Sequence, residues 1–178
     1  PESLSKIRGI AYRDKNEIIM NDPEKIVPNN KMDTDLPGYA WDLLPYKSKP
    51  LDLYRAPMWH AEYDFEKRTP YASLQTSLGC QFGCNFCMIN ILNRNDNEEV
   101  GVASNYSGMR FWTTEFIIKE FDKLIDMGVK TIRIVDEMFL LNPKYYIPLC
   151  KELAERNKDD SLRIWSYSRI DTVKRPEI

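Results

Sequence analysis

Three of the four cysteines in this chain, Cys80, Cys84 and Cys87, are grouped with the spacing C-x3-C-x2-C. Thiolates are soft ligands, which suit zinc and iron–sulfur clusters. A four-iron cluster ordinarily takes four cysteine ligands. Three thiolates would therefore leave one iron with an open coordination position, where a small molecule can bind and react.

The residues around the cysteines favour a tight metal-binding loop. Gly79 and Gly83 precede the first two cysteines, and glycine lets backbone amides approach an anionic, thiolate-ligated cluster closely. Phe86, directly before the third cysteine, would place a flat apolar wall beside the open iron. The stretch 71–78 is short and partly β-branched, so it is predicted to be the strand that delivers the loop.

Other interpretations of the cysteines are open on the residues alone. The three thiolates can belong to a zinc site in which Cys150 or His60 supplies the fourth ligand. A disulfide framework is disfavoured, because the group is odd in number and no signal peptide is evident. A chance grouping of buried cysteines is the remaining interpretation.

The composition is that of an ordinary globular protein. The chain has 178 residues, 43% of them hydrophobic and 29% charged, with a formal net charge of −2. It has no apolar stretch long enough to span a bilayer, and its near-neutral balance gives no electrostatic footprint for nucleic acid. We therefore expect neither a membrane nor a nucleic acid as partner. A thiolate cluster suits the reducing cytoplasm, and the missing initial methionine suggests a fragment of a longer protein.

The chain changes character near residue 70. Seven prolines lie from Pro23 to Pro70, and this part is predicted to contain a β-hairpin, with strands at 7–13 and 17–20, followed by an extended connector at 32–54. From residue 71 onward, strands are predicted to alternate with helices.

The alternating part predicts a parallel sheet. Its strands are expected at 71–78, 130–135 and 162–167. The first helix is expected to begin at Thr113 or Thr114 and to end at Gly128, the second to be capped by Asn142, and the third to begin at Asp171. Functional residues of such folds gather at the carboxyl ends of the strands. The cysteine loop, the pair Asp136 and Glu137, and the pair Ser168 and Arg169 all fall at such ends.

Several other residues are expected to be structural. Arg110 could contact a ligand, but a surface salt bridge is the favoured interpretation. Cys150 is expected to pack in the core on a helix face shared with Ile147 and Ala154. His60, the only histidine, could contact substrate or a cofactor, but a structural hydrogen bond is the favoured interpretation. The connector aromatics Tyr39 and Trp41 are expected to pack against the fold.

The cysteine loop resembles that of the radical S-adenosylmethionine (SAM) enzymes. Their signature, C-x3-C-x-aromatic-C, is carried by Cys80, Cys84, Phe86 and Cys87. The resemblance implies that the three thiolates hold a [4Fe-4S] cluster whose open iron binds the amino and carboxylate groups of SAM. One electron would then cleave SAM to a 5′-deoxyadenosyl radical, which abstracts hydrogen from a substrate. Phe86 would contact the adenine, mainly through its backbone.

The resemblance also implies further SAM-binding residues. Asp136 and Glu137 stand where the family often carries Gly-Gly-Glu, and the sequence Asp-Glu-Met-Phe found here is similar to the form in cobalamin-dependent members. Either carboxylate would suit the ammonium group of SAM. Ser166 and Arg169 are candidates to contact the SAM carboxylate or the substrate. They lie on opposite faces if the strand continues that far.

The subgroup is indicated by the segments 9–13 and 36–45, which resemble the link between a cobalamin-binding domain and the radical SAM barrel. The implied fold is α/β: the N-terminal half of a partial (β/α) TIM-like barrel, preceded by a proline-rich linker and hairpin. Residues 1–70 would be the end of a cobalamin-binding-type domain and linker, and residues 71–178 an incomplete radical SAM core. Cobalamin would be bound mainly by a domain outside this chain. The chain itself contains no Asp-x-His-x-x-Gly motif.

The resemblance leaves the reaction open. A cobalamin-dependent methyltransferase is the first expectation, with an unknown substrate and an electron donor such as flavodoxin or ferredoxin. Radical cyclisation, rearrangement or methylthiolation is the second. A non-catalytic zinc or iron–sulfur binding module is the third.

Overall fold

The computed structural model describes residues 4–48 except 23 and 25, residues 70–89 except 83 and 85, and residues 108–174. The chain divides into two compact units, each described here by itself. We call the first the hairpin unit, Pro1–Val27 with Gln81–Gly108, and the second the core unit, Pro28–Cys80 with Met109–Ile178. Among the described residues, no helix combines the length and apolar character needed to cross a bilayer.

The hairpin unit contains the predicted β-hairpin. A 3₁₀ turn at Leu4–Lys6 precedes strands β1 (Ala11–Asp14) and β2 (Glu17–Met20), which pair antiparallel. The tight turn between them includes Lys15 with a φ of 52°. The hairpin prediction is confirmed, with the first strand displaced toward the turn.

The core unit is built on a three-stranded parallel sheet, so the mixed α/β prediction is confirmed at this level. Its strands are β3 (Tyr71–Leu74), β6 (Thr131–Ile134) and β7 (Arg163–Trp165), with β6 in the centre. The third strand is shorter than the predicted 162–167. Closure of this sheet into a barrel stays a prediction.

The predicted continuous strand at 71–78 is wrong. It is divided into β3 and a short strand β4 (Ser77–Leu78), and β4 pairs antiparallel with β5 (Arg110–Phe111). The division has a physical cause in the two residues between the strands. The Gln75 amide donates to the Tyr39 hydroxyl at 2.9 Å and the Thr76 amide donates to Asp136 Oδ1 at 2.6 Å. Side chains thus hold both amides, and the strand direction changes.

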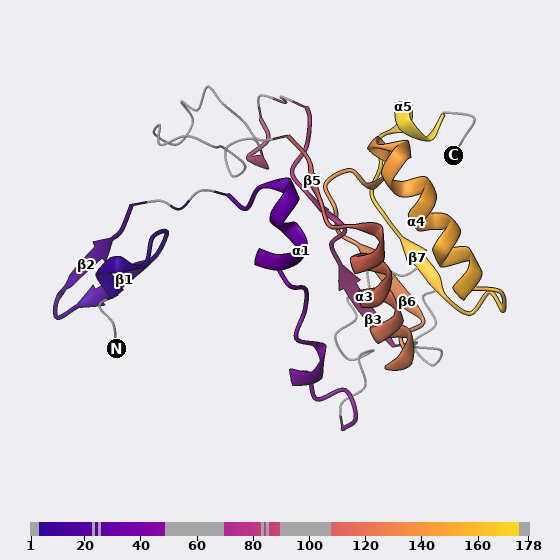
Figure 1. Cartoon of the computed structure of the whole chain (residues 1–178), viewed down its shortest axis with the longest axis horizontal. Coiled ribbons are helices and arrows are strands. Elements are labelled where there is room, and N and C mark those ends of the chain that lie inside the picture. The colour runs from indigo at the N-terminus through magenta and orange to yellow at the C-terminus, as the bar shows by residue number, and fades with distance from the viewer. Residues whose placement is uncertain are drawn as a thin grey trace. The chain divides into compact units, whose positions relative to one another are not determined.

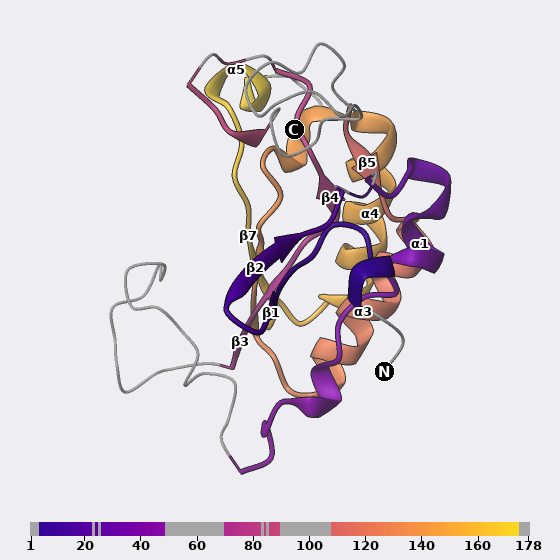
Figure 2. The ribbon, with the colours of Figure 1, turned by 90° about the vertical axis from the view of Figure 1, so that its left-hand side faces the viewer.

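Helices α3 (Thr114–Asp126) and α4 (Pro143–Arg156) lie on the same side of the sheet in both ribbon views (Figures 1 and 2). The predicted caps are confirmed. The Thr113 side chain accepts from the Phe116 amide at 3.2 Å, and Asn142 Oδ1 accepts from the Lys144 amide at 3.2 Å. A 3₁₀ turn at Phe139–Leu141 precedes α4, and the short helix α5 (Ile170–Val173) begins one residue before the predicted Asp171.

The apolar core lies between the sheet and these two helices. Alternate residues of β3 and β6 face it, as expected for side chains that alternate along a strand. The buried apolar residues of the sheet and the two helices include Leu74, Ile117, Phe121, Leu124, Ile132, Ile134, Leu149 and Leu153.

The predicted core face of α4 is wrong. Cys150 and Ala154 are exposed and Ile147 is half-buried, whereas the neighbouring stripe is buried. That stripe consists of Tyr145, Tyr146, Leu149 and Leu153. The large tyrosine and leucine side chains bury more apolar area than the smaller stripe would, which sets the rotation of the helix.

The predicted extended connector contains helical turns instead. These are η2 (Asn29–Lys31), α1 (Met32–Asp35) and η3 (Trp41–Leu43). Trp41 Nε1 donates at 2.9 Å to Oε2 of Glu120, a carboxylate of α3 that is only 2% exposed. The predicted packing role of Trp41 is thereby confirmed.

The segment around α1 also fixes the start of α3. Asp33 accepts from the amide of Thr113 at 2.9 Å and from its hydroxyl at 2.6 Å. Trp112 Nε1 donates to the Leu36 carbonyl at 2.8 Å. Residues from Asn29 onward therefore belong to the core structurally, although they lie far from it in sequence.

Gly38 supplies a sharp test of this packing. Its φ is 92°, and a Cβ atom there would lie 2.9 Å from Glu120 Oε1 and 3.2 Å from Phe116 Cζ. Gly128 has a similar φ of 84° with nothing within 4 Å of such a Cβ. We expect Gly38→Ala to lower the free energy of unfolding by about 2–3 kcal/mol, from backbone strain plus overpacking, and Gly128→Ala by about 1 kcal/mol, from strain alone. Denaturant unfolding measures both, and equal losses would show that Gly38 is not tightly packed.

Candidate cofactor-binding site

The cysteine loop begins where β4 ends. Cys80 closes the core unit, and Cys84 and Cys87 belong to the hairpin unit. The Cys87 amide donates to the Cys84 carbonyl at 3.0 Å, which forms a turn between these two ligand candidates. All three thiols are free and partly exposed, so none is in a disulfide. Phe86 is 87% exposed and does not pack in a core.

Convergence of the three thiols stays a prediction. Within the described part of the chain, no group of three or more His, Cys, Asp or Glu side chains is gathered as metal ligands. Cys150, one candidate for a fourth ligand, lies exposed on α4 beside Ile134 and Ile164. The other candidate, His60, and the loop glycine Gly83 lie outside the described residues.

Asp136 is a buried clamp on the strand that leads into the loop. It is 1% exposed and lies two residues after the end of β6. Its Oδ1 accepts from the Thr76 amide at 2.6 Å, and its Oδ2 accepts from the hydroxyls of Thr76 at 2.6 Å and Ser77 at 2.7 Å. Burial raises the pKa of this carboxyl, and the donated hydrogen bonds oppose that rise. Both of its carboxylate oxygens therefore accept hydrogen bonds from Thr76 and Ser77.

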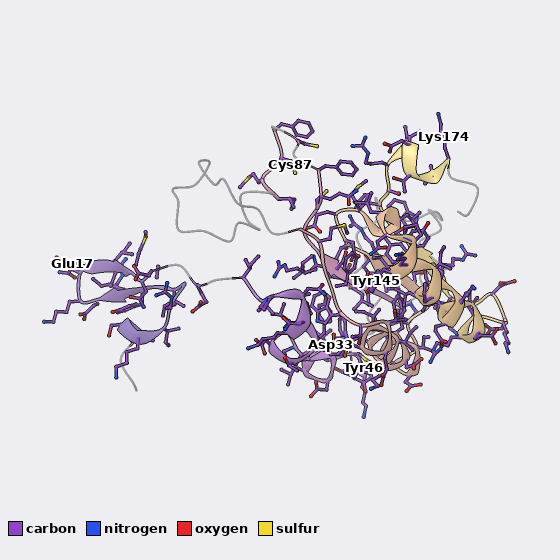
Figure 3. The ribbon with its side chains drawn as sticks, turned by 45° about the horizontal axis from the view of Figure 1, so that its top comes forward. Glu17, Asp33, Tyr46, Cys87, Tyr145 and Lys174 are labelled. Atoms are coloured by element: carbon purple, nitrogen blue, oxygen red, sulfur yellow. The ribbon has the colours of Figure 1, made fainter. Side chains whose placement is uncertain are left out.

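Two further side chains bind the residues between β3 and β4. The Tyr145 hydroxyl of α4 donates to the Thr76 carbonyl at 2.8 Å, and Tyr39 accepts from the Gln75 amide. Tyr145 lies within the core unit, as its label in Figure 3 shows, and its ring is 4.5 Å from that of Phe111. Burial raises its pKa well above the usual range for tyrosine. The backbone that precedes Cys80 is therefore fixed by the buried hydrogen bonds of Asp136 and Tyr145 and by the exposed hydrogen bond to Tyr39.

Glu137, the residue after Asp136, has a carboxylate with one oxygen that is not hydrogen-bonded within the described part of the chain. Its Oε2 is buried and has no hydrogen-bond partner among the described residues. Burial is the largest influence on its pKa and raises it, and neighbouring Asp136 adds to the rise. Hydrogen bonds from its own amide and from the amide of Gly79, together with the charge of Arg110, oppose it. Glu137 thus contacts the backbone immediately before Cys80 and keeps one acceptor for a ligand.

Arg110 is the main residue that sequence analysis misjudged here. A surface salt bridge was expected, but this arginine lies in β5 and is 8% exposed. Burial lowers its pKa and the Glu137 carboxylate raises it. No local pattern marks it, because its burial depends on the pairing of β4 with β5.

The segment after β7 joins the same edge. The Phe139 amide, three residues after Asp136, donates to the Tyr167 carbonyl at 3.3 Å. Ser168 Oγ is buried with no hydrogen-bond partner among the described residues, and Ser166 is half-buried. The Arg169 guanidinium is bound to Asp171 at 2.9 Å and 3.0 Å. Contacts of Ser166 and Arg169 with a ligand stay predictions.

The arrangement brings together groups that suit a cationic and polar ligand. Buried hydrogen bonds join Thr76 and Ser77, which follow β3, to Asp136, which follows β6. A backbone hydrogen bond from Phe139 to Tyr167 joins the segment after β7. One carboxylate, Asp136, holds the edge together, and the other, Glu137, has an oxygen available for a donor such as an ammonium group. Sequence analysis named both carboxylates but did not separate their roles.

Two curated proteins are similar in sequence to this chain. The chain is 26% identical to an uncharacterized methyltransferase of Pyrococcus horikoshii over 171 residues. This alignment covers 95% of the chain and 30% of that protein. It is 32% identical to the hopanoid C-2 methylase of Rhodopseudomonas palustris over 110 residues. This alignment covers 60% of the chain and 18% of that protein. The chain thus spans less than a third of the length of either relative.

No family model matches the chain, and no solved structure matches it. Both relatives are named for the transfer of a methyl group, so the chain is distantly related to methyl-transferring enzymes.

Proposed function

We propose that this chain is part of a radical SAM methyltransferase, in which Cys80, Cys84 and Cys87 hold a [4Fe-4S] cluster and Glu137 helps to bind SAM. The observation that carries the proposal is the link between the cysteine loop and an available carboxylate. The amide of Gly79, directly before Cys80, donates to Glu137, and the Oε2 atom of Glu137 is buried with no hydrogen-bond partner in the described part of the chain.

The donor set fits the proposed cluster. Three free, partly exposed thiols are spaced C-x3-C-x2-C, and Gly79 has a φ of 88°, which few other residues adopt. When bound, the cluster supplies the electron that cleaves the sulfonium C–S bond of SAM. Such oxygen-sensitive chemistry suits the cytoplasm and an electron donor such as flavodoxin or ferredoxin.

Different residues would position the cysteine loop and SAM. Asp136 and Tyr145 fix Thr76 and Ser77, and so fix the backbone from which Cys80 extends. Glu137 offers its available oxygen to the ammonium group of SAM, since a charge-assisted hydrogen bond is strongest where water is excluded. Phe86 remains exposed and available to the adenine.

Methyl transfer is favoured over other radical reactions by the names of the two relatives. Cobalamin would be the methyl carrier, and no residue described here is assigned to it. The assignment of residues 1–70 to the end of a cobalamin-binding-type domain and linker belongs to the same proposal.

Glu137→Gln is expected to raise the dissociation constant for SAM about tenfold, because it replaces a charge-assisted hydrogen bond with a neutral one. Equilibrium dialysis of the cluster-loaded protein with labelled SAM measures this. Glu115→Gln is the matched control, since Glu115 is exposed on α3 and paired with Lys119. A normal dissociation constant for Glu137→Gln would remove Glu137 from the site.

The function itself is tested by anaerobic reconstitution of the whole protein with iron and sulfide, followed by dithionite reduction with methyl-labelled SAM. We expect 5′-deoxyadenosine to form, and label to reach a product when cobalamin and substrate are supplied. 5′-Deoxyadenosine without label transfer would indicate cyclisation or rearrangement instead. Stoichiometric zinc with no bound iron would contradict the proposal.

A further inference from the structure

A pocket of about 330 Å³ lies in the core unit, between residues 39–46 and the C-terminal end of α3. We call it the aromatic pocket, and its volume falls in the range of small-molecule sites, about 300–1,000 Å³. Its lining consists of three aromatic rings, one thioether and three charged side chains: Tyr39, Trp41, Tyr46, Met127, Asp42, Lys123 and Asp126. Among the described residues, this lining includes neither the cysteines nor the carboxylates Asp136 and Glu137, so the aromatic pocket is separate from the candidate cofactor-binding site.

Two of the three aromatic rings in this pocket are fixed in place at their polar ends. The rings of Tyr39 and Trp41 are stacked, with their centres 4.6 Å apart, so each ring keeps one outer face. The Tyr39 hydroxyl accepts from the Gln75 amide at 2.9 Å, and Trp41 Nε1 donates to Glu120 at 2.9 Å. Tyr46, labelled in Figure 3, supplies the third ring. Rings that are already held lose little freedom when a ligand binds, which lowers the cost of binding.

The charge of the aromatic pocket is negative. Lys123 is its one cation among the described residues, and its Nζ lies 2.5 Å from Oε1 of Glu120, which balances that charge within α3. Asp42 and Asp126 add two exposed carboxylates. Neither of them forms an ion pair or a side-chain hydrogen bond within the described part of the chain. The faces of aromatic rings are also electrically negative, so rings and carboxylates together attract a cation and repel an anion.

We propose that the aromatic pocket binds a small organic cation with a trimethylammonium group. Such a group has no N–H to donate, so ring faces and nearby carboxylates recognise it better than hydrogen-bond acceptors do. Its methyl groups also suit the polarizable thioether of Met127. A primary ammonium group is strongly hydrated and would lose water that these rings do not replace. The inference goes beyond the proposed function and does not rest on it.

Choline is the probe, and its uncharged carbon analogue, in which a tert-butyl group replaces trimethylammonium, has the same shape. Isothermal titration calorimetry of the whole protein should give choline a dissociation constant about tenfold or more below that of the analogue. Tyr46→Leu should raise the choline constant about fivefold because it removes a ring, whereas Tyr46→Phe keeps the ring and should change it little. Asp126→Asn should raise it about threefold, because the lost carboxylate is exposed and its attraction is partly screened.

Asp14→Asn is the matched control, since Asp14 is an exposed carboxylate of the hairpin, and it should leave choline binding unchanged. Equal binding of the carbon analogue, or an unchanged choline constant in both Tyr46→Leu and Asp126→Asn, would overturn the proposal. Tighter binding of methylguanidinium than of choline would indicate an arginine side chain as the occupant and would also overturn it. If Tyr46→Leu does not fold by circular dichroism, Asp126→Asn decides the test alone. The titration needs no cluster, so its outcome is independent of SAM cleavage.

Discussion

Replacing Cys84 with alanine is expected to prevent assembly of a stable [4Fe-4S] cluster and to abolish SAM cleavage. The motif supplies three thiolates, and removal of one leaves two ligands for a cluster that ordinarily takes four. Iron and sulfide content after anaerobic reconstitution measures the first effect, and formation of 5′-deoxyadenosine measures the second. The thiol of Cys84 is free and partly exposed, so its loss should leave the fold intact.

Cys150→Ala is the matched control. Cys150 lies on α4, away from the C-x3-C-x2-C motif in sequence, and partial burial of its thiol raises its pKa. The cluster should form normally in this variant. Loss of the cluster would instead support a four-cysteine site, and retention of cluster and cleavage in Cys84→Ala would exclude the three-cysteine assignment.

Asp136→Ala is expected to lower the free energy of unfolding by about 3 kcal/mol or more. The substitution leaves the buried Thr76 amide and the hydroxyls of Thr76 and Ser77 without their acceptor, and each unpaired buried donor costs about 1–3 kcal/mol. Because these residues fix the backbone before Cys80, cluster occupancy should fall as well. Guanidinium unfolding and iron content measure the two effects.

Asp171→Ala controls for the loss of a carboxylate. Asp171 is exposed and its ion pair is with nearby Arg169, so the change should alter stability by about 0.5 kcal/mol or less. An equally small effect of Asp136→Ala would show that the junction between β3 and β4 does not depend on this carboxylate. A large stability loss with normal cluster content would confine Asp136 to a structural role.

The parallel sheet and the caps of its helices were predictable because local signals specify them. Thr113 and Asn142 are N-caps by residue type, and Gly128 ends α3 with a φ of 84°. Strand β6 was also predictable, because its β-branched residues lie between Gly128 and the acidic pair Asp136 and Glu137.

The unpredicted features depend on contacts between distant parts of the chain. The division of β3 from β4 arises from hydrogen bonds to Tyr39 and Asp136, neither of which is near in sequence. The burial of Arg110 follows from the pairing of β5 with β4. The exposure of Cys150 follows from competition between two helix stripes, which is decided by the size of the side chains and not by their spacing.

The two carboxylates at the end of β6 show the same limit within the candidate site. Sequence analysis placed Asp136 and Glu137 together at a strand end, where either suits an ammonium ligand. Only the three-dimensional partners separate them, because Thr76 and Ser77 occupy Asp136 while one oxygen of Glu137 has no partner among the described residues.

The central claim is tested most directly by electron paramagnetic resonance of the whole protein, reconstituted without oxygen and reduced with dithionite, before and after addition of SAM. The account predicts a [4Fe-4S]⁺ signal that shifts when SAM is added, because SAM binds the iron that Cys80, Cys84 and Cys87 leave open. A cluster signal that SAM does not change, or stoichiometric zinc with no cluster signal, would contradict it.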